Sequence, residues 1–120
     1  MRLKRYNKYH NSKNKDGDSK KERRRKAELQ MLEKAGAIKD LQCQVKFELI
    51  PKQELLRPKF ENGRKVKSER AVSYIADFTY IKDNKLIVED VKSPVTRALP
   101  LYIVKRKLML YIHGIQIYEV

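Results

Sequence analysis

Alternation of apolar and polar residues predicts three strands in the middle of the chain. Residues 43–50, CQVKFELI, alternate between the two kinds, as expected for a strand buried on one face. The stretch YIADFTYIKDNKLIVEDVKS holds two further apolar runs, separated by Asp83 and Asn84. We assign these runs to strands at about 71–82 and 85–92.

Helical patterns flank these strands. The capping-box sequence SKKE predicts a helix that begins at about Ser19, and Gly36 supplies its stop. In ALPLYIVKRKLMLYIHG, apolar residues recur at helical spacing at Leu101, Val104, Leu108 and Tyr111 or Ile112. IQIYEV reads as a final short strand. The order helix, three strands, helix, strand predicts an α/β fold with a sheet flanked by helices.

Two segments lie outside this pattern. Residues 1–18 are rich in Lys, Asn, Asp and Ser and predict a flexible basic arm, which leaves 19–120 as a single domain. Residues 51–70 carry two prolines, one glycine and many charges. We interpret them as an exposed connection that could include the ends of a long hairpin.

The charge of the chain indicates a polyanionic partner. The net charge is +14, and residues 1–26 hold 12 Lys/Arg against 3 Asp/Glu. Basic residues near phosphates release condensed counterions, which makes nucleic acid the expected partner. Tyr6 and Tyr9 lie among these basic residues, where they could stack on nucleobases. The alternative is a solvated basic tail without a target.

Several other classes of protein are disfavoured. Cys43 is the only cysteine, so no internal disulfide forms, which fits a reducing cytoplasm. His10 and His113 are far apart in the sequence, which argues against a structural zinc site. No apolar run is long enough to span a membrane, and we identify no signal peptide. We expect Cys43 and His113 to be packing residues.

The two central apolar strands raise a question about their acidic residues. If Asp83 and Asn84 form a two-residue turn, the paired positions place Asp77 directly opposite Asp90. Lys92 lies two residues beyond Asp90 and therefore on the same face. Like charges at facing positions destabilise a hairpin, so something must compensate.

A divalent cation is one such compensation. Mg²⁺ or Mn²⁺ takes carboxylate oxygens and leaves positions for water and phosphate oxygens. An adjacent lysine could position an attacking water and stabilise developing negative charge. Asp77, Asp90 and Lys92 therefore form a candidate site for phosphodiester hydrolysis. The alternative is an ion pair bridged by Lys92 on a solvated sheet face.

The same residues resemble the PD-(D/E)XK nuclease superfamily, whose common core has this order of elements. The resemblance is carried, in chain order, by Glu22 on the first helix, Asp77, the run Glu89-Asp90-Val91-Lys92, and Lys105 and Lys107 on the second helix. The segments DSKKE, EKAGAIKDLQCQVKFELIP, YIADFTY and VEDVKS are similar to a small phage- and prophage-associated family of uncharacterised proteins assigned to that superfamily. The resemblance covers about residues 16–110. It implies a restriction-endonuclease-like αβββαβ core with a mixed sheet.

The resemblance also implies roles for the candidate site residues. Asp77 and Asp90 would bind the metal, with the backbone carbonyl of Val91 as a further ligand. Lys92 would be the catalytic lysine. Glu22 would match an extra acidic residue of the site, or would simply be the capping-box partner in its helix.

A second group of residues is expected near the nucleic acid. It comprises Gln44, Arg23, Arg24, Tyr102, Lys105 and Lys107. Gln44 matches a glutamine of the narrower family but could be an exposed strand residue. The basic residues of both helices could equally cover solvated helix faces. Glu89 points away from Asp90 in the predicted register, and we interpret it as structural.

The resulting hypothesis is a metal-dependent endonuclease that acts on DNA in the cytoplasm of a bacterial host, encoded by a phage or prophage. Cleavage of branched DNA during recombination is favoured, because no base-reading element is evident. Members of the superfamily commonly work as dimers, so a homodimer is possible. The rival hypotheses are a non-catalytic nucleic-acid-binding protein and an RNA-binding accessory protein.

Overall fold

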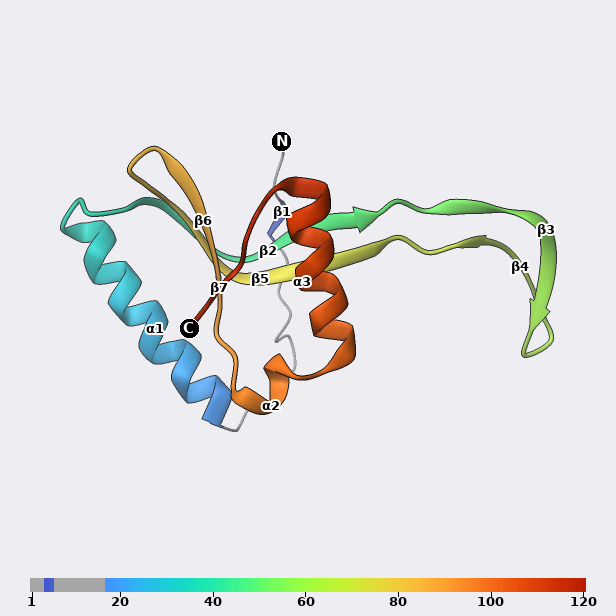
Figure 1. The fold of residues 1–120 in the computed structure, drawn as a ribbon, viewed down its shortest axis with the longest axis horizontal. Coiled ribbons are helices and arrows are strands. Elements are labelled where there is room, and N and C mark those ends of the chain that lie inside the picture. Colours follow the sequence, from blue (N-terminus) through green and yellow to red (C-terminus); the bar gives the residue numbers. More distant parts are fainter. Residues whose placement is uncertain (1–3, 6–16) are drawn as a thin grey trace.

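The computed structural model describes residues 4–5 and 17–120 and contains a mixed sheet with helices against it (Figure 1). The main sheet has five strands, in the spatial order β1 (Lys4–Arg5), β2 (Lys39–Ile50), β5 (Val72–Lys82), β6 (Lys85–Asp90) and β7 (Tyr118–Glu119). Neighbouring strands are antiparallel except β6 and β7, which are parallel. The predicted α/β class with a mixed sheet flanked by helices is confirmed.

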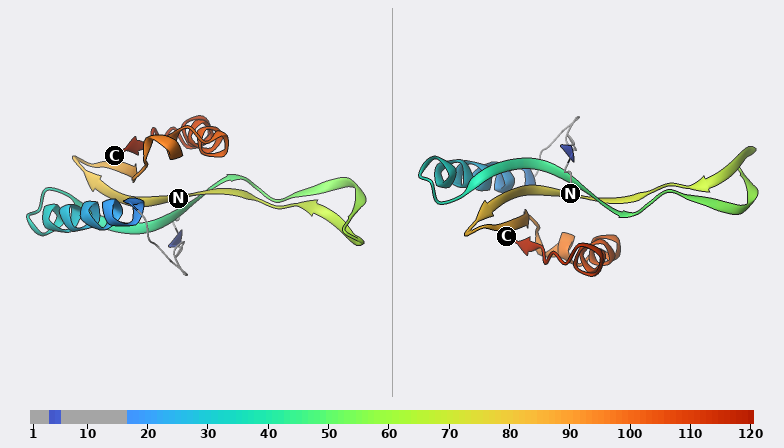
Figure 2. Two further views of the ribbon diagram at one scale, coloured as in Figure 1. Left: turned by 90° about the horizontal axis from the view of Figure 1, so that it is seen from below. Right: turned by 90° about the horizontal axis from the view of Figure 1, so that it is seen from above.

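Three helices accompany the sheet, namely α1 (Gly17–Lys34), α2 (Pro94–Arg97) and α3 (Pro100–His113). Figure 2 shows α3 standing off one face of the sheet, with α1 beside the end that α3 does not cover. Because α1 begins at Gly17, Ser19 lies inside the helix and cannot be its N-cap, so that prediction is wrong. The side chain of Ser93 instead caps α2, accepting a hydrogen bond from the backbone N–H of Thr96.

The β5–β6 hairpin has the predicted turn and register. Asp83 and Asn84 have positive φ angles of 53° and 65°, as a two-residue type I′ turn requires. Lys82 pairs with Lys85, and the ladder continues in one register to its last pair, Phe78 with Glu89. The connection between these strands is therefore fixed by the turn that their sequence specifies.

Two buried clusters hold the sheet to the helices. One cluster joins Val45, Phe47 and Ala76 to Tyr102 and Met109 of α3. The other cluster joins Leu29 of α1 to the buried residues Ile38, Phe78, Tyr80 and Val91. The first cluster therefore packs under α3, and the second packs under Leu29 of α1.

The face to which side chains point changes along β2 and β5. Ala76 belongs to the cluster under α3, whereas Phe78, two residues later, belongs to the cluster under α1. Residues two apart on a regular strand share a face, so the alternation breaks between them. Gln44, which the β2–β5 register places opposite Asp77, has a positive φ of 55°. The break thus occurs where this strained backbone lies.

Of the residues that predicted helix α3, Leu108 packs against the core and is partly buried, whereas others point outward. Leu101, Val104 and Tyr111 expose 66%, 52% and 87% of their surface. Tyr102 and Met109 are the residues that it buries. The expected helix is present, but its main apolar stripe faces outward because Tyr102 and Met109 fill the space over the sheet.

Residues 51–70 form a β-ribbon, which we call the β3–β4 arm. It contains β3 (Gln53–Glu61) and β4 (Arg64–Glu69), paired only with each other. Asn62 and Gly63, with φ angles of 52° and 76°, form the turn between them. The sequence pattern suggested the ends of a hairpin within a connection, whereas nearly the whole segment is strand.

The N-terminal region is described only in part. Lys4 and Arg5 form β1, which pairs with Lys46 and Val45 of β2. Tyr6, Tyr9 and the rest of the predicted arm up to residue 16 lie outside the described residues. Among the helices that are described, none is both long and apolar enough to cross a membrane.

A buried ionic contact joins α1 to the centre of the sheet. Glu89 is fully buried, and both of its carboxylate oxygens accept hydrogen bonds from Arg25, at 2.9 and 2.7 Å. The hydroxyl of Tyr80 donates to the same carboxylate. The hydrogen bond with Glu89 raises the pKa of Arg25 above its ordinary value. The structural role inferred for Glu89 fits this arrangement.

We predict that Arg25→Met lowers the free energy of unfolding by about 3 kcal/mol, because it leaves the Glu89 carboxylate buried without its cation. Urea unfolding followed by circular dichroism measures the change. Arg24→Met, one residue earlier and exposed, is the matched control and should change stability by less than about 0.5 kcal/mol. Equal effects of the two substitutions would contradict the prediction.

Candidate active site

Asp77 and Asp90 lie at facing positions on β5 and β6. The ladder ends at Phe78 with Glu89, and one further step in the same register sets Asp77 opposite Asp90. Asp77 exposes only 1% of its surface and Asp90 exposes none. Asp77 Oδ2 accepts a hydrogen bond of 2.9 Å from the backbone N–H of Val91, where β6 has just ended. The pair is therefore a buried acidic centre at the end of the hairpin.

Asp90 contacts a tyrosine and a lysine through the same oxygen. Tyr74 donates its hydroxyl to Asp90 Oδ2 at 2.6 Å, and the Lys92 ammonium lies 3.3 Å from that atom. Burial, together with the negative charge of Asp90, raises the pKa of Tyr74 far above its ordinary value. Tyr74 therefore stays protonated and acts as a donor across the accessible pH range.

Lys92 is held between the acidic pair and α3. Its side chain is 16% exposed, and its ammonium lies 4.9 Å from the centre of the Tyr102 ring. The backbone of Lys92 is also tied: its N–H donates to Val120 at 3.3 Å, and its carbonyl accepts from the Lys21 ammonium at 3.3 Å. Helix α1 and the C-terminal residue Val120 thus both fix the position of this lysine.

Tyr102, which contacts Lys92 through its ring, also contacts β7 through its hydroxyl. Its hydroxyl donates to Glu119, and Arg106 lies 3.2 Å from the same carboxylate. Burial alone would raise the pKa of Glu119, but the hydrogen bonds from Tyr102 and Arg106 outweigh it and leave the pKa below its ordinary value. Tyr102 therefore supports Lys92 and α3 instead of presenting its hydroxyl outward.

Glu22 lies at the border of the acidic centre. Its Oε2 accepts a hydrogen bond of 3.0 Å from the side-chain amide of Gln44, whose position on β2 is opposite Asp77. The structure thus brings Glu22 and Gln44 together and sets them beside the predicted acidic pair. This bond joins Glu22 to a strand, whereas a capping box would bond it within its own helix.

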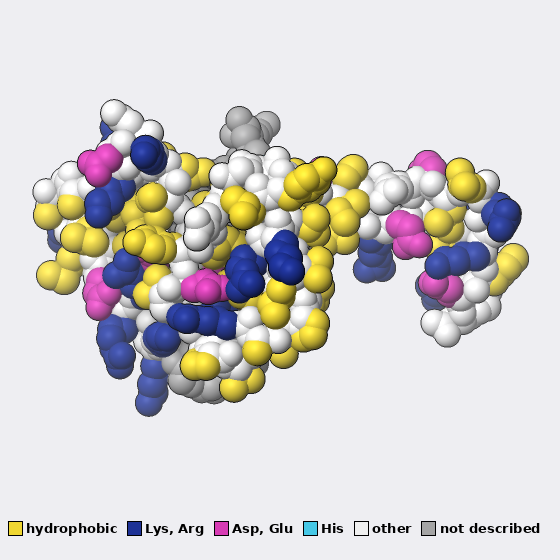
Figure 3. Space-filling model, in the orientation of Figure 1, with side chains coloured by type: hydrophobic (Ala, Val, Ile, Leu, Met, Phe, Trp, Pro, Cys, Tyr) yellow, Lys and Arg dark blue, Asp and Glu magenta, His cyan; other side chains and the backbone are white. Residues whose placement is uncertain are grey.

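An open groove of about 300 Å³ lies next to Lys92. It is lined by Tyr74, Ile75, Lys92, Thr96, Leu99, Leu101, Tyr102 and Lys105. Tyr74 and Lys92 both contact Asp90, so the groove borders the acidic centre. Figure 3 shows Lys and Arg side chains gathered over the region between α1 and α3. The surface around the centre is therefore suited to an anion.

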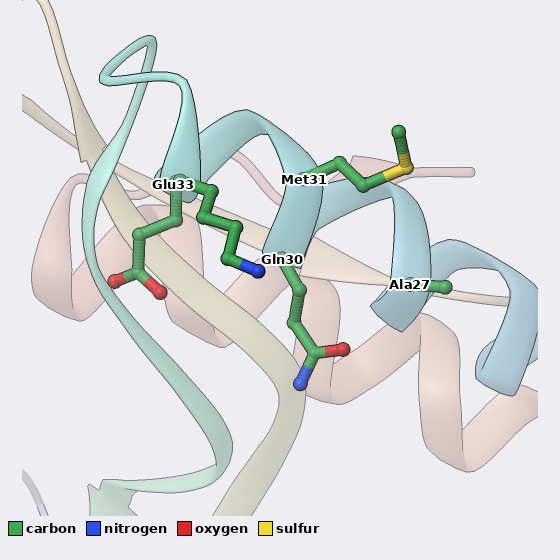
Figure 4. Close-up of a pocket in the computed structure, with 5 residues that line it drawn as sticks. Ala27, Gln30, Met31 and Glu33 are labelled. Carbon is green, nitrogen blue, oxygen red and sulfur yellow. The ribbon is translucent and has the colours of Figure 1, made fainter.

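A second hollow, of about 550 Å³, lies on α1 and does not have the features of a site. Its lining comes from the C-terminal half of the helix: Ala27, Gln30, Met31, Glu33 and Lys34. In Figure 4, Met31 and Glu33 point in different directions, and Glu33 accepts a hydrogen bond from the backbone of Leu41. Polar groups do not converge there, in contrast to the groove beside Lys92.

The predicted residues fall into three groups. Asp77, Asp90, Val91 and Lys92 lie together, with Glu22 and Gln44 at their border. Tyr102 and Lys105 line the groove. The remaining three, Arg23, Arg24 and Lys107, are exposed on their helices.

Sequence reasoning missed three contacts of the site, made by Tyr74, Lys21 and Arg106. Tyr74 lies three residues before Asp77, and on a regular strand residues three apart point to opposite faces of the sheet. The break in alternation near Gln44 brings the hydroxyl of Tyr74 to Asp90. Lys21 and Arg106 reach the site through long-range packing of helices, for which a single sequence carries no signal.

The geometry fits a sparsely liganded hard cation. Within residues 4–5 and 17–120, no group of three or more His, Cys, Asp or Glu side chains is placed to hold a metal ion. This excludes, for the described residues, a three-carboxylate cluster that includes Glu22. Mg²⁺ is often bound by only one or two carboxylates, with water and phosphate in the other positions, and Asp77 with Asp90 match that donor set.

Comparison with known proteins gives one family. A family model described as "Protein of unknown function (DUF1064)" matches residues 3–116. The chain belongs to the DUF1064 family. No curated protein matches the chain at a significant level, nor does any solved structure. The family match spans the acidic centre, Lys92 and the groove of this DUF1064 protein, as well as its β3–β4 arm.

We predict that Glu119→Gln destabilises the protein by about 1 kcal/mol at neutral pH, because neutral Gln binds Tyr102 and Arg106 more weakly. The folded-state pKa of Glu119 lies below the ordinary 4.5, so its contribution is complete above that pH and is lost as the pH falls through the folded value. Urea unfolding at a series of pH values should show the two proteins converging in acid.

Glu54→Gln, an exposed substitution on the β3–β4 arm, is the control and should follow the unsubstituted protein at every pH. A Glu119→Gln difference that does not shrink as the pH is lowered below 4.5 would contradict the proposed titration.

Proposed function

We propose that this protein is a metal-dependent endonuclease that hydrolyses DNA phosphodiester bonds and belongs to the PD-(D/E)XK superfamily. The observation that carries the proposal is the register of β5 and β6. It sets Asp77 opposite Asp90, with the Lys92 ammonium 3.3 Å from Asp90. Two facing acids with an adjacent amine are the groups that metal-dependent phosphodiester hydrolysis requires.

Asp77 and Asp90 would hold Mg²⁺ or Mn²⁺, with the Val91 carbonyl at the end of β6 as a further ligand. When bound, the cation makes a phosphate more electrophilic and a bound water more acidic. Tyr74 and the Val91 N–H fix the two carboxylates through their hydrogen bonds. The protein thereby orients its acidic oxygens before substrate arrives, which avoids reorganisation during the reaction.

Lys92 is the residue that we assign to the attacking water. Its ammonium borders both Asp90 and the groove, so it can donate a hydrogen bond to a water in the groove. The same charge stabilises negative charge that develops on the phosphate. Tyr102 keeps the ammonium in place from the α3 side, at 4.9 Å from its ring centre.

The groove supplies a path for the phosphate backbone. Lys105 lines it together with Lys92, and both cations can neutralise phosphates. Arg23, Arg24 and Lys107 are exposed on the two helices, where they add sequence-independent attraction. Branched DNA is the substrate that we favour, in phage or prophage recombination within the host cytoplasm, with a homodimer as the working form.

A second function has its own supporting observation. Asp77 and Asp90 are almost completely buried, and Lys92 is already engaged by Asp90 and the Tyr102 ring. A closed ionic centre of this kind suits a non-catalytic protein that binds DNA or RNA through its surface charge. The two functions differ in whether divalent cations produce cleavage, which makes them separable by experiment.

We predict that the protein nicks or cleaves DNA in Mg²⁺ or Mn²⁺ and not in EDTA. Asp90→Asn and Lys92→Met should each lower the rate by about 10³-fold, since each removes several kcal/mol of transition-state stabilisation. Plasmid, single-stranded, four-way-junction DNA and single-stranded RNA are compared by gel electrophoresis. Cleavage of the junction in preference to linear duplex is expected.

Asp83→Asn and Lys85→Met, at the exposed turn of the same hairpin, are the matched controls and should retain full activity. Absence of cleavage from every substrate, with binding preserved, would support the non-catalytic alternative. Cleavage that survives both Asp90→Asn and Lys92→Met would remove these residues from the mechanism.

We also predict that Mn²⁺ stabilises the folded protein without any substrate. A ligand that binds only the folded state at a hundredfold its dissociation constant adds about 2.7 kcal/mol to the free energy of unfolding. Thermal unfolding should therefore show a higher Tm in Mn²⁺ for the unsubstituted protein and for Asp83→Asn. Asp77→Asn should abolish the increase, whereas an increase of equal size in that variant would place the cation elsewhere.

A further inference from the structure

The β3–β4 arm extends away from the body of the protein. Figures 1 and 2 show it as a thin two-stranded ribbon that continues β2 and β5 beyond the end of the sheet, and the protein's longest dimension is 55 Å. Neither buried cluster contains a residue of β3 or β4. A two-stranded ribbon alone is only marginally stable in water, so an exposed one of this length requires an explanation.

The arm has an excess of basic residues. Residues 51–70 contain seven Lys/Arg and three Asp/Glu, a net charge of +4. Two of the three acids, Glu61 and Glu69, are paired with Lys59, at 3.0 and 3.6 Å. Two of the acidic groups of the arm are thus paired with one lysine, and Figure 3 shows further Lys and Arg side chains on the arm beside acidic and apolar ones.

One face of the arm combines an aromatic ring with lysines. Phe60 pairs directly with Lys65 and exposes 72% of its surface. Lys67 lies two residues beyond Lys65 on β4 and hence on the same face. Leu56 of β3 is fully exposed. Large apolar side chains beside basic residues on a projecting element indicate a binding surface.

We propose that the β3–β4 arm is a second DNA-binding element that lies in the major groove of a duplex. The major groove is about 12 Å wide and admits a two-stranded ribbon, whose strands are about 4.8 Å apart. Lys65 and Lys67 contact phosphates, and Phe60 makes apolar contact with the bases or sugars. This inference rests on the proposed function for the identity of the partner as DNA.

The arm is poorly suited to pairing with a second copy of the protein. Both of its strands are edges, but β3 contains Pro58, which lacks a backbone donor. The pairing register of β3 and β4 also shifts between Glu54 and Lys59. Proline, a register shift and edge lysines are features that prevent strands from adding to each other, which leaves the side-chain faces as the contact surface.

The length of the arm determines where it meets the DNA. Arg64, next to the turn, lies thirteen positions before Asp77 of the acidic centre. At about 3.3 Å per residue the two are up to roughly 40 Å apart, about one turn of B-DNA. The arm therefore contacts the duplex about one helical turn from the phosphate at the acidic centre, and it anchors a duplex branch without entering the reaction.

The test is binding of a fluorescent duplex of about 30 bp, roughly three helical turns, measured by anisotropy in EDTA over a range of salt concentrations. Lys65→Glu/Lys67→Glu should weaken binding about tenfold and reduce the slope of log K against log salt by about 2, because two phosphate contacts are lost. Phe60→Ala should weaken binding with little change of slope, because it removes an apolar contact.

Lys82→Glu/Lys85→Glu is the matched control, since it makes the same change of charge at the exposed end of the other hairpin. It should bind within about threefold of the unsubstituted protein. Equal weakening by the two double variants would overturn the proposal, because only net charge would then matter. Circular dichroism checks that each variant is folded.

Two other results would also overturn the proposal. One is loss of self-association by Lys65→Glu/Lys67→Glu in sedimentation, with DNA binding unchanged. The other is arm-dependent binding to anionic lipid vesicles without arm-dependent binding to DNA. Cleavage assays separate this proposal from the proposed function. If binding depends on the arm but Mg²⁺ produces no cleavage, the proposed nuclease activity is contradicted and the role of the arm is not. If the protein cleaves DNA but binding does not depend on the arm, the role of the arm is contradicted and the nuclease activity is not.

Discussion

Three carboxylates buried in the middle of a small sheet are the constraint on which this structure depends. Asp77, Glu89 and Asp90 each expose 1% or less of their surface, on two adjacent strands. A buried carboxylate is costly unless it is hydrogen-bonded and compensated by charge. Each therefore requires donors, and these come from α1, from β5 and from the residues that follow β6.

The buried carboxylates have different partners on the two faces of the sheet. On the side of α1, Glu89 is bound by the fork of Arg25 and by Tyr80, which is a closed structural contact. On the side of α3, Asp90 meets Tyr74 and Lys92 next to an open groove. Adjacent acids in one strand thus have separate roles, because alternation directs them to opposite faces. Glu89 holds α1 against the sheet, and Asp90 borders a groove that a ligand can reach.

Local signals accounted for the elements and for the acidic hairpin. The Asp83-Asn84 turn specifies its own φ angles, and the turn then sets the register that brings Asp77 to Asp90. The arm was predicted only as an exposed connection that could include the ends of a hairpin, and the outward stripe of α3 was not predicted, because apolar periodicity reports an element and not which neighbour covers it. Tyr74 was missed for a related reason: its contact with Asp90 depends on a break in alternation near Gln44, where a non-glycine residue has a positive φ.

The body and the arm depart from ordinary folding rules in opposite ways. The body buries charge that would be more stable in water, whereas the arm exposes Phe60 and Leu56, which would be more stable in a core. Neither arrangement improves the stability of an isolated chain, and departures of this kind concentrate at functional sites. A polyanion resolves both. In the proposed complex with DNA, the phosphates would lie along the groove beside Lys92, and the grooves of the DNA would cover the apolar side chains of the arm. A single extended partner is therefore a more economical explanation than separate ligands for the two ends of the molecule.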